Sequence, residues 1–147
     1  MSAPPTPTVQ ECVEGYLYAL GPLELLLFRR TPARERIWVP IQGKVEPSDR
    51  DFEAAIAREV REETGLSTLR RIWPLDWHVS FQHEGGPWRL HAYAIETVRS
   101  FAPVLNEEHE SWEWVPPAEA VRRLHFEDNR GAVARLLERL AASSQSL

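Results

Sequence analysis

The clearest repeating pattern in the chain spans residues 51–64, where apolar and acidic positions recur every three or four residues. At about 100° per residue, this spacing places them on one side of a helix. The stripe consists of Phe52, Ile56, Glu59 and Glu63. Asp49 or Asp51 can cap the helix at its start, and Gly65 supplies the left-handed residue that ends it. We therefore predict a helix from about Asp51 to Thr64 whose apolar stripe becomes acidic in its second half.

Apolar runs and alternating positions elsewhere in the chain predict strands. The expected strands are Glu11–Leu20, Leu23–Arg30, Ile37–Val39, Leu69–His83, Trp88–Val98 and Ser111–Val115. The run Leu25–Phe28 is apolar without alternation, which indicates a strand buried on both faces. Pro40 stops the third strand, and we expect Gln42 and Gly43 to turn the chain toward the central helix.

Two further helices are predicted near the C-terminus. One starts at Pro117 and runs through about Leu124, because proline suits the first turn of a helix. The other is capped by Asn129 or Asp128 and carries one apolar stripe of valine and leucine residues. Strands combined with one central helix and C-terminal helices predict an α+β domain or an α/β/α sandwich around a mixed β-sheet.

Length and composition predict one domain. The chain has 147 residues, of which 43% are hydrophobic, enough for one proper core and too few for two ordinary domains. We expect residues 1–8 to be a disordered leader, residues 9–142 the folded domain and residues 143–147 a frayed tail. A lone cysteine, Cys12, excludes an internal disulfide framework and fits a reducing cytoplasm, so we expect a cytoplasmic protein.

Charge and hydropathy limit the partners. The chain has 17 basic and 22 acidic residues and a net charge of −5, whereas proteins that bind the nucleic acid backbone usually have a basic surface. We therefore expect no nucleic acid partner. We also expect no membrane partner, because the chain lacks both a secretory signal and an apolar run of about 18 residues. The sequence leaves open whether the chain forms a homodimer.

The acidic residues Glu59, Glu62 and Glu63 can be interpreted in two ways. A charge run is usually a solvated helix face, but such a face lies opposite the apolar stripe, and these glutamates continue or border that stripe. Carboxylates near a helix C-terminus also oppose the macrodipole and repel one another. A hard divalent cation held by oxygen ligands removes both problems, so the spacing favours a metal site.

The segment Gly43–Leu66, GKVEPSDRDFEAAIAREVREETGL, resembles the Nudix box of the Nudix hydrolases. That box is a Gly, five residues, a Glu, seven residues and then Arg-Glu-apolar-x-Glu-Glu-x-Gly-apolar. The second half matches throughout, and the first half has one residue too many. The expected Glu is replaced by Asp49 or, counting back from Arg58, by Arg50. We expect the surplus residue in the loop Glu46–Asp51, where an insertion is tolerated.

The resemblance implies a set of metal-binding and catalytic carboxylates. Glu59, Glu62 and Glu63 are the expected ligands of Mg²⁺, with Mn²⁺ as a substitute. Family members often carry a Glu-His pair shortly before a Trp-apolar strand, with that glutamate near the metal. Glu108 and His109 resemble the pair, so Glu108 is the expected fourth carboxylate. The competing residues in the same loop are Glu107 and Glu110.

Other residues of the expected site have different roles. Arg58, placed in the catalytic motif by the resemblance, lies on another face of the helix from Glu59, so we expect it to fix the helix by pairing with a carboxylate. Gly43 allows the backbone to come close to a ligand. Arg29 and Lys44 are candidates for phosphate contacts in the substrate.

The resemblance also implies a reaction, the hydrolysis of a nucleoside diphosphate linked to another group, by water attacking phosphorus. Divalent ions neutralise the pyrophosphate and lower the pKa of a bound water. The C-terminal features loosely resemble those of pyrophosphohydrolases of nucleoside triphosphates and dihydroneopterin triphosphate, which we favour. The Gly-Lys-Val-Glu-Pro sequence resembles that of dinucleoside polyphosphate hydrolases, the alternative. The irregular first half of the box leaves a third hypothesis, a Nudix domain that binds nucleotides or a partner without catalysis.

Overall fold

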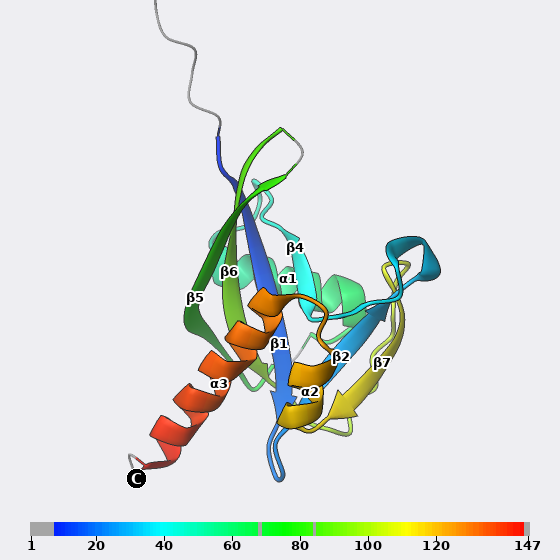
Figure 1. The fold of residues 1–147 in the computed structure, drawn as a ribbon, viewed down its shortest axis with the longest axis vertical. Helices are drawn as coiled ribbons and strands as arrows, with labels where there is room; N and C mark the ends of the chain where they lie inside the picture. The colour runs from blue at the N-terminus through cyan, green and yellow to red at the C-terminus, as the bar shows by residue number, and fades with distance from the viewer. Residues whose placement is uncertain (1–7, 68, 84, 146–147) are drawn as a thin grey trace, which may run out of the picture.

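The computed structural model describes residues 8–67, 69–83 and 85–145 (Figure 1). Its elements in chain order are β1 (Gln10–Ala19), β2 (Glu24–Arg30), a 3₁₀ helix (Pro32–Arg34), β3 (Trp38–Val39), β4 (Ile41–Lys44), α1 (Phe52–Thr64), β5 (Arg71–His83), β6 (Gly86–Glu96), β7 (His109–Val115), α2 (Pro117–Arg123) and α3 (Glu127–Gln145). Most of the predicted leader, residues 1–7, lies outside the described part.

The strands of the described residues form one mixed sheet in the order β3-β2-β1-β6-β5, with β4 pairing β1 and β7 pairing β2. Strands β1 and β6 are parallel, and the other pairs are antiparallel. The central strand β1 changes partner along its length. Its residues Cys12–Gly15 pair with β4, and Leu17–Ala19 pair with β2.

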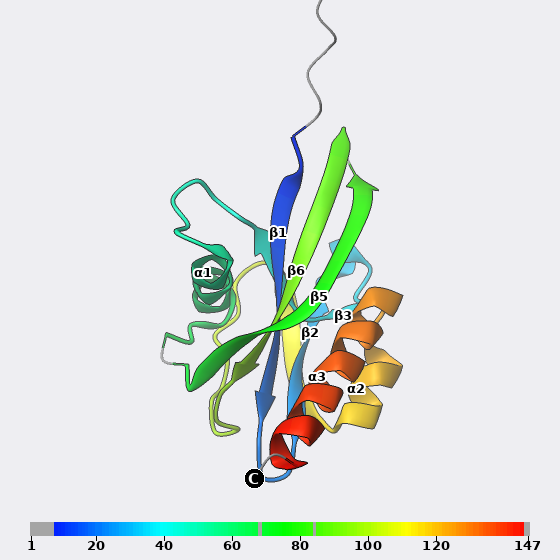
Figure 2. The same ribbon diagram turned by 90° about the vertical axis from the view of Figure 1, so that its left-hand side faces the viewer.

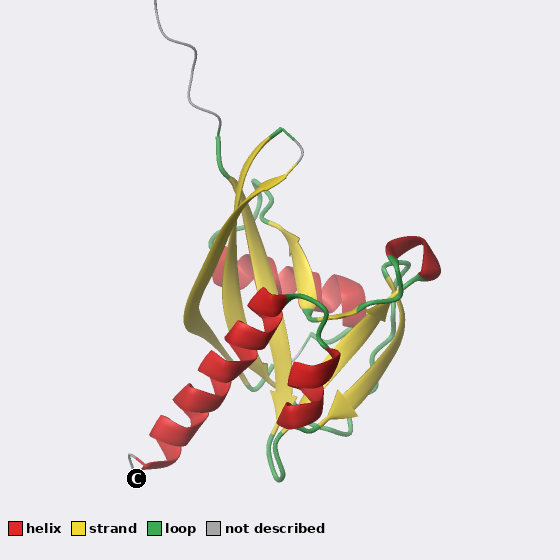
Figure 3. Ribbon diagram, viewed as in Figure 1, coloured by secondary structure: helices red, strands yellow, loops and turns green. Residues whose placement is uncertain are grey.

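Helices cover both faces of this sheet. Figure 2 shows α1 on one side and α2 with α3 on the other, and Figure 3 shows the same arrangement by type of element. Alternate residues of β1 supply the two cores. Val13 and Leu17 pack with the apolar stripe of α1, while Tyr16 and Tyr18 pack with that of α3. The predicted α/β/α sandwich with a mixed sheet is therefore confirmed. Within the described residues, no helix combines the length and the apolar character needed to cross a membrane.

Two local predictions are wrong. Gln42 and Gly43 do not turn the chain; they lie within strand β4, where Gly43 is in register with Val13 of β1. The last helix begins at Glu127, so Asn129 lies inside it and is buried instead of capping its start. This helix also continues through Gln145, into the stretch predicted to fray, and residues 146–147 lie outside the described part.

Asn129 is buried because it belongs to a polar cluster with Glu14 and Tyr16. The Tyr16 hydroxyl donates a hydrogen bond to Glu14, and the Asn129 amide donates to Tyr16 Oη at 3.1 Å and to Glu14 Oε2 at 3.3 Å. Burial raises the pKa of Glu14 to about 7, even though both donors favour its charged form.

The raised pKa of Glu14 predicts a loss of stability as pH rises. The folded state holds this proton more tightly than the unfolded chain, so the stabilisation is complete below the ordinary pKa of 4.5 and is lost as pH rises to about 7. The difference corresponds to about 3 kcal/mol. Urea unfolding from pH about 4 to about 8 should show this fall relative to Glu14→Gln, which cannot titrate there. Parallel pH dependence in the two proteins would contradict the prediction.

Candidate active site

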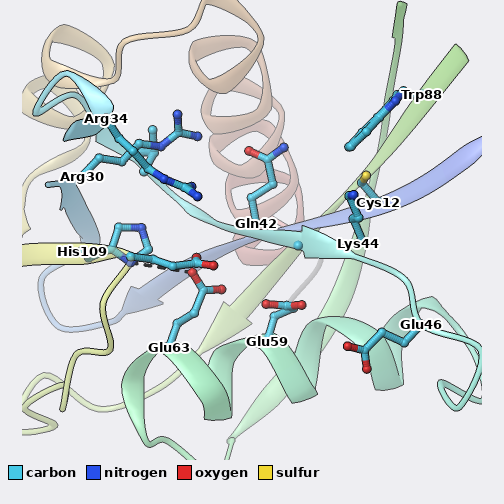
Figure 4. A pocket seen from close by; sticks show the side chains of 13 residues that line it. Cys12, Arg30, Arg34, Gln42, Lys44, Glu46, Glu59, Glu63, Trp88 and His109 are labelled. Carbon is cyan, nitrogen blue, oxygen red and sulfur yellow. Dashed lines mark ion pairs between the residues drawn. The ribbon is translucent and has the colours of Figure 1, made fainter. Parts of the chain in front are cut away.

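A cleft of about 370 Å³ lies beside the point where β1 changes partner (Figure 4). Helix α1 forms one wall, from which Glu59 and Glu63 point into the cleft. Cationic side chains lie around the rest of it. They are Arg30 of β2, Arg34 of the 3₁₀ helix and Lys44 of β4. The cleft therefore has carboxylates on one side and cations on the other, which suits a metal ion that carries a phosphate group.

The two glutamates of α1 are positioned by a helix with both ends capped. Asp51 accepts a hydrogen bond from the Ala54 amide at 2.7 Å, and Gly65 at φ 80° ends the helix in the left-handed conformation. These caps and the bounds of α1 agree with the predicted helix. Glu59 is 9% exposed and Glu63 is 1% exposed, so the acidic half of the stripe does face inward. The alternative of a solvated acidic face is excluded for these two residues.

Arg58 fixes this helix to the loop before it. Its guanidinium makes a bidentate pair with Asp49, with both N–O distances 2.9 Å, and donates to the Lys44 carbonyl oxygen at 3.0 Å. It also donates to Glu59 at 2.9 Å and to Glu62 at 3.1 Å. Of the two candidates for the expected Glu, Asp49 is therefore the one that pairs with Arg58, whereas Arg50 lies 3.6 Å from Asp51.

Gly43 makes room for Glu59. A Cβ atom built on Gly43 would lie 2.1 Å from Glu59 Cδ and 2.2 Å from its Oε1, far inside van der Waals contact. A residue with a side chain at this position would therefore push the Glu59 carboxylate out of its place. Burial raises the pKa of Glu59, while the Arg58 guanidinium opposes that rise.

Glu63, Glu108 and His109 form the group best suited to a cation. Each offers one ligand atom, and these atoms lie within 4.8 Å of one another. Both Glu63 oxygens and His109 Nδ1 are buried without a hydrogen-bond partner in the described structure, although Nδ1 lies 3.7 Å from Glu63 Oε1. Burial raises the pKa of Glu63 to about 11, and the contacts of its carboxyl group with Glu108 and then with Glu59 act in the same direction. A bound cation would offset the free-energy cost of burying the charged Glu63 carboxylate, so these residues fit a divalent metal.

Of the three glutamates considered, Glu107 and Glu108 lie in the loop before β7 and Glu110 lies within β7, and the structure brings Glu108 into the cleft. Glu107 is exposed, and Glu110 instead pairs with Arg29 at 2.9 Å and Arg36 at 3.3 Å. The Glu108 backbone amide donates to the Asn106 side chain at 3.0 Å, which orders the loop that carries it.

Glu108→Gln should lower turnover by ~10- to 10³-fold, because the amide keeps the size of the side chain and removes its charge. Thermal stability should change little, since Glu108 is half-buried at the surface of the cleft. Steady-state kinetics with saturating metal would measure the effect. Glu107→Gln is the matched control, and a cost at Glu107 equal to that at Glu108 would refute the assignment.

Of the remaining predicted site residues, some line the cleft and others lie outside its described lining. Glu62 is 51% exposed and pairs with Arg58, and the described lining of the cleft does not include it. Arg29 likewise lies apart from that lining, with its guanidinium 5.7 Å from the Trp38 ring centroid. Lys44 lines the cleft, with its ammonium 5.0 Å from the Trp88 ring centroid, and its contact with a phosphate stays a prediction.

Among the residues of the cleft that the sequence did not indicate as site residues are Arg30, Arg34 and His109. The adjacent Arg29 and Arg30 could not be told apart because the run Leu25–Phe28 before them is apolar without alternation. His109 was visible only as the neighbour of Glu108. Burial lowers its pKa to about 4, so the imidazole is neutral at pH 7 and can serve as a metal ligand.

Comparison with known proteins identifies the family. The chain matches the model of the NUDIX domain over residues 18–136. It is 34% identical over 137 residues to an octanoyltransferase of Myxococcus xanthus, an alignment that covers 90% of this chain and 37% of that protein. It is 26% identical over 109 residues to an asymmetrical bis(5'-nucleosyl)-tetraphosphatase of Caenorhabditis elegans, covering 73% of this chain and 78% of the relative.

Solved structures show the same fold. A C. elegans Ap4A hydrolase in a binary complex superposes with a TM-score of 0.76 and 21% identity, covering 91% of this chain and 99% of that one. The Escherichia coli dihydroneopterin triphosphate pyrophosphohydrolase has a TM-score of 0.71 and 18% identity, covering 86% of this chain and 95% of that one. The predicted family and fold are thereby confirmed, and the family match supports the predicted class of enzyme, a pyrophosphatase.

Proposed function

Because this chain belongs to the NUDIX family, we propose that it is a metal-dependent pyrophosphohydrolase that cleaves a nucleoside diphosphate linked to another group. The observation that carries this proposal is the buried Glu63 carboxylate, whose two oxygens have no hydrogen-bond partner among the described residues. A carboxylate in that state is stable only when protonated or bound to a cation. The facing cations Arg30 and Lys44 supply positive charge for a bound phosphate.

The residues that would hold a divalent ion are Glu63 and Glu108, with His109 beside them. When bound, Mg²⁺ or Mn²⁺ supplies charge neutralisation for a pyrophosphate and lowers the pKa of a water. Oxygen ligands from two carboxylates suit either ion. Glu108 comes from the loop before β7 and Glu63 from α1, so the site joins two separate parts of the fold.

Glu59 is the residue we assign to accept the proton of the attacking water. It lines the cleft beside Glu63, and burial raises its pKa, which makes the carboxylate a stronger base than an exposed glutamate. Arg58 donates a hydrogen bond to its Oε1 at 2.9 Å, which fixes the orientation of the carboxylate. Arg58 is then a positioning residue that acts through Glu59.

Two substrate classes are supported by the relatives. The C. elegans relative carries the name of an asymmetrical dinucleoside tetraphosphatase, and one structural neighbour acts on dihydroneopterin triphosphate. Both names describe a heterocycle joined to a chain of phosphates. We favour a triphosphate substrate, and a dinucleoside polyphosphate is the alternative. The hypothesis of a non-catalytic domain rests on the irregular first half of the box. We do not retain it, because Asp49 pairs with Arg58 despite that irregularity.

Metal removal tests the proposed function. Protein stripped with EDTA should release no phosphate or pyrophosphate from nucleoside triphosphates, dinucleoside polyphosphates or nucleotide sugars, because the negative charge of cleft and substrate is then uncompensated. Added Mg²⁺ or Mn²⁺ should restore turnover. Equal turnover in EDTA and in Mg²⁺ would overturn the proposal, and so would a complete absence of products across the screen.

A further inference from the structure

The loop between β6 and β7, residues 97–108, is attached to the C-terminal end of α1. The backbone amide of Val104 donates a hydrogen bond to the Thr64 carbonyl oxygen at 2.8 Å. The side-chain amide of Asn106 donates to the Glu62 carbonyl oxygen at 3.4 Å. Both acceptors are among the last four carbonyl groups of α1, which have no partner inside the helix. The loop therefore caps the helix from another part of the chain.

Asn106 also contacts the residue that the loop brings to the cleft. Its oxygen Oδ1 accepts a hydrogen bond from the backbone amide of Glu108 at 3.0 Å, while its nitrogen Nδ2 is the donor to Glu62. The reverse orientation of the amide would set Oδ1 against a carbonyl oxygen and Nδ2 against an N–H group, so the observed one is favoured. One side chain thus joins the backbone of Glu108 to the residue beside Glu63.

These contacts act where α1 is electrostatically unfavourable. Glu63 lies in the last turn of the helix and is 1% exposed, close to the negative end of the helix dipole. Glu63 and Glu108 place ligand atoms within 4.8 Å of each other, so the two carboxylates repel when both are charged. The hydrogen bonds from Val104 and Asn106 to α1 oppose that repulsion, because they keep the loop against the helix.

We propose that Asn106 is a positioning residue for the metal site, because it ties the Glu108 loop to α1 and so sets the separation of the Glu63 and Glu108 carboxylates. The described lining of the cleft does not include Asn106, so it acts through Glu108 and not on the substrate. Partners that orient metal ligands commonly contribute ~10- to 10²-fold to metal affinity. The proposal rests on the proposed function in taking Glu63 and Glu108 as the ligands.

Metal affinity gives the first test. In Asn106→Ala, the Kd for Mn²⁺ measured by calorimetry should rise by ~10- to 10²-fold, because the two carboxylates are no longer held at the distance that the ion needs. At saturating Mn²⁺, kcat should stay within ~3-fold of the wild-type value, since the bound ion then holds both carboxylates itself. A residue that only stabilises the fold would lower the urea midpoint and leave the Kd unchanged, and that result would overturn the proposal.

Val104→Ala is the matched control on the same loop. The Val104 side chain is 75% exposed, and the substitution keeps the backbone amide that bonds to Thr64. The Kd for Mn²⁺ should therefore stay within ~3-fold of the wild-type value. An equal rise in Kd in Val104→Ala and Asn106→Ala would mean that any change in the loop disturbs the site, and it would refute a specific role of Asn106.

Asn106→Ser separates the two contacts of the side chain. A serine hydroxyl can accept from the amide two residues on, as Oδ1 does here, but serine lacks the second polar atom that reaches the Glu62 carbonyl oxygen. Its Kd for Mn²⁺ should match that of Asn106→Ala within ~3-fold, because the link to α1 is lost in both. A wild-type Kd in Asn106→Ser would show that only the contact inside the loop matters, which contradicts the tie to α1.

Hydrogen exchange without metal separates this proposal from the proposed function. In EDTA, the backbone amide of Glu108 should exchange at least ~10-fold faster in Asn106→Ala than in the wild-type chain, since its acceptor is gone. If the wild-type chain hydrolyses a substrate and Asn106→Ala shows neither faster exchange nor weaker Mn²⁺ binding, the positioning role fails and the proposed function stands. If exchange is faster as expected but the wild-type chain binds no Mn²⁺ and hydrolyses no compound of the screen, the proposed function fails, and Asn106 ties the loop to α1 without a metal role.

Discussion

Replacing Glu63 by glutamine is expected to lower turnover by at least ~10²-fold while the fold survives. Glutamine keeps the size of the side chain and loses the charge that a metal ion needs. The Glu63 carboxylate is 1% exposed, and burial with two neighbouring carboxylates raises its pKa to about 11, so the apo protein holds it protonated at pH 7. The neutral amide therefore replaces a neutral acid, and stability without metal should change little.

The comparison that makes this result specific is Glu62→Gln on the next residue of the same helix. Glu62 is 51% exposed and contacts Arg58, so its loss should cost at least ~10-fold less turnover than the loss of Glu63. Metal titration by calorimetry should show weakened Mn²⁺ binding in Glu63→Gln alone. Equal effects of the two variants on turnover would mean that Glu62 contributes to metal binding as much as Glu63 does. The metal would then lie toward the outer side of α1, an arrangement that the spacing of the glutamates in the sequence also allows.

The features predicted correctly from the sequence are those set by local chemistry. The bounds of α1 follow from its capping residues and its apolar stripe. These signals depend only on residues that lie close together in the sequence. The replacement for the expected Glu was not decidable from the sequence, because one extra residue in a loop leaves the count ambiguous. The choice of Asp49 over Arg50 depends on which side chain reaches the Arg58 guanidinium in three dimensions.

The cations of the cleft illustrate why the rest could not be predicted. Arg29 and Arg30 follow an apolar run without alternation, so strand periodicity assigns neither to a face. The pairing of β2 with β7 also shifts register between these two residues. Arg29 then pairs with Glu110, while Arg30 lines the cleft. A bulge depends on the partner strand, and a single sequence does not contain that information.

Long-range pairing explains the other differences. Strand β4 is only four residues long and exists because the first half of β1 lacks another partner on that side. Asparagine is a favoured residue type at a helix start, but the Asn129 amide instead donates a hydrogen bond to Glu14, which is far away in the sequence. In both cases, contacts between distant parts of the chain outweigh the preference of the local sequence. Both cases occur beside the proposed site.

Gly43→Ala should lower turnover by at least ~10²-fold, although it replaces no ionisable residue. The new methyl carbon would lie 2.1 Å from Glu59 Cδ, so the carboxylate must move away, and a displacement of about 1 Å is enough for such a loss. Because the clash is with the end of a flexible side chain, the fold should survive, at a cost of about 1–3 kcal/mol.

Gly86→Ala is the matched control for this substitution, since a Cβ there meets nothing within 4 Å, and it should leave turnover near the wild-type level. A double-mutant cycle gives the sharper measurement. In a Glu59→Ala background, Gly43→Ala should lower turnover by less than ~3-fold, because the side chain that it displaces is already gone. A full additional ~10²-fold loss in that background would mean that Gly43 acts through the backbone of β4, by direct approach to the ligand, and that Glu59 is not its target.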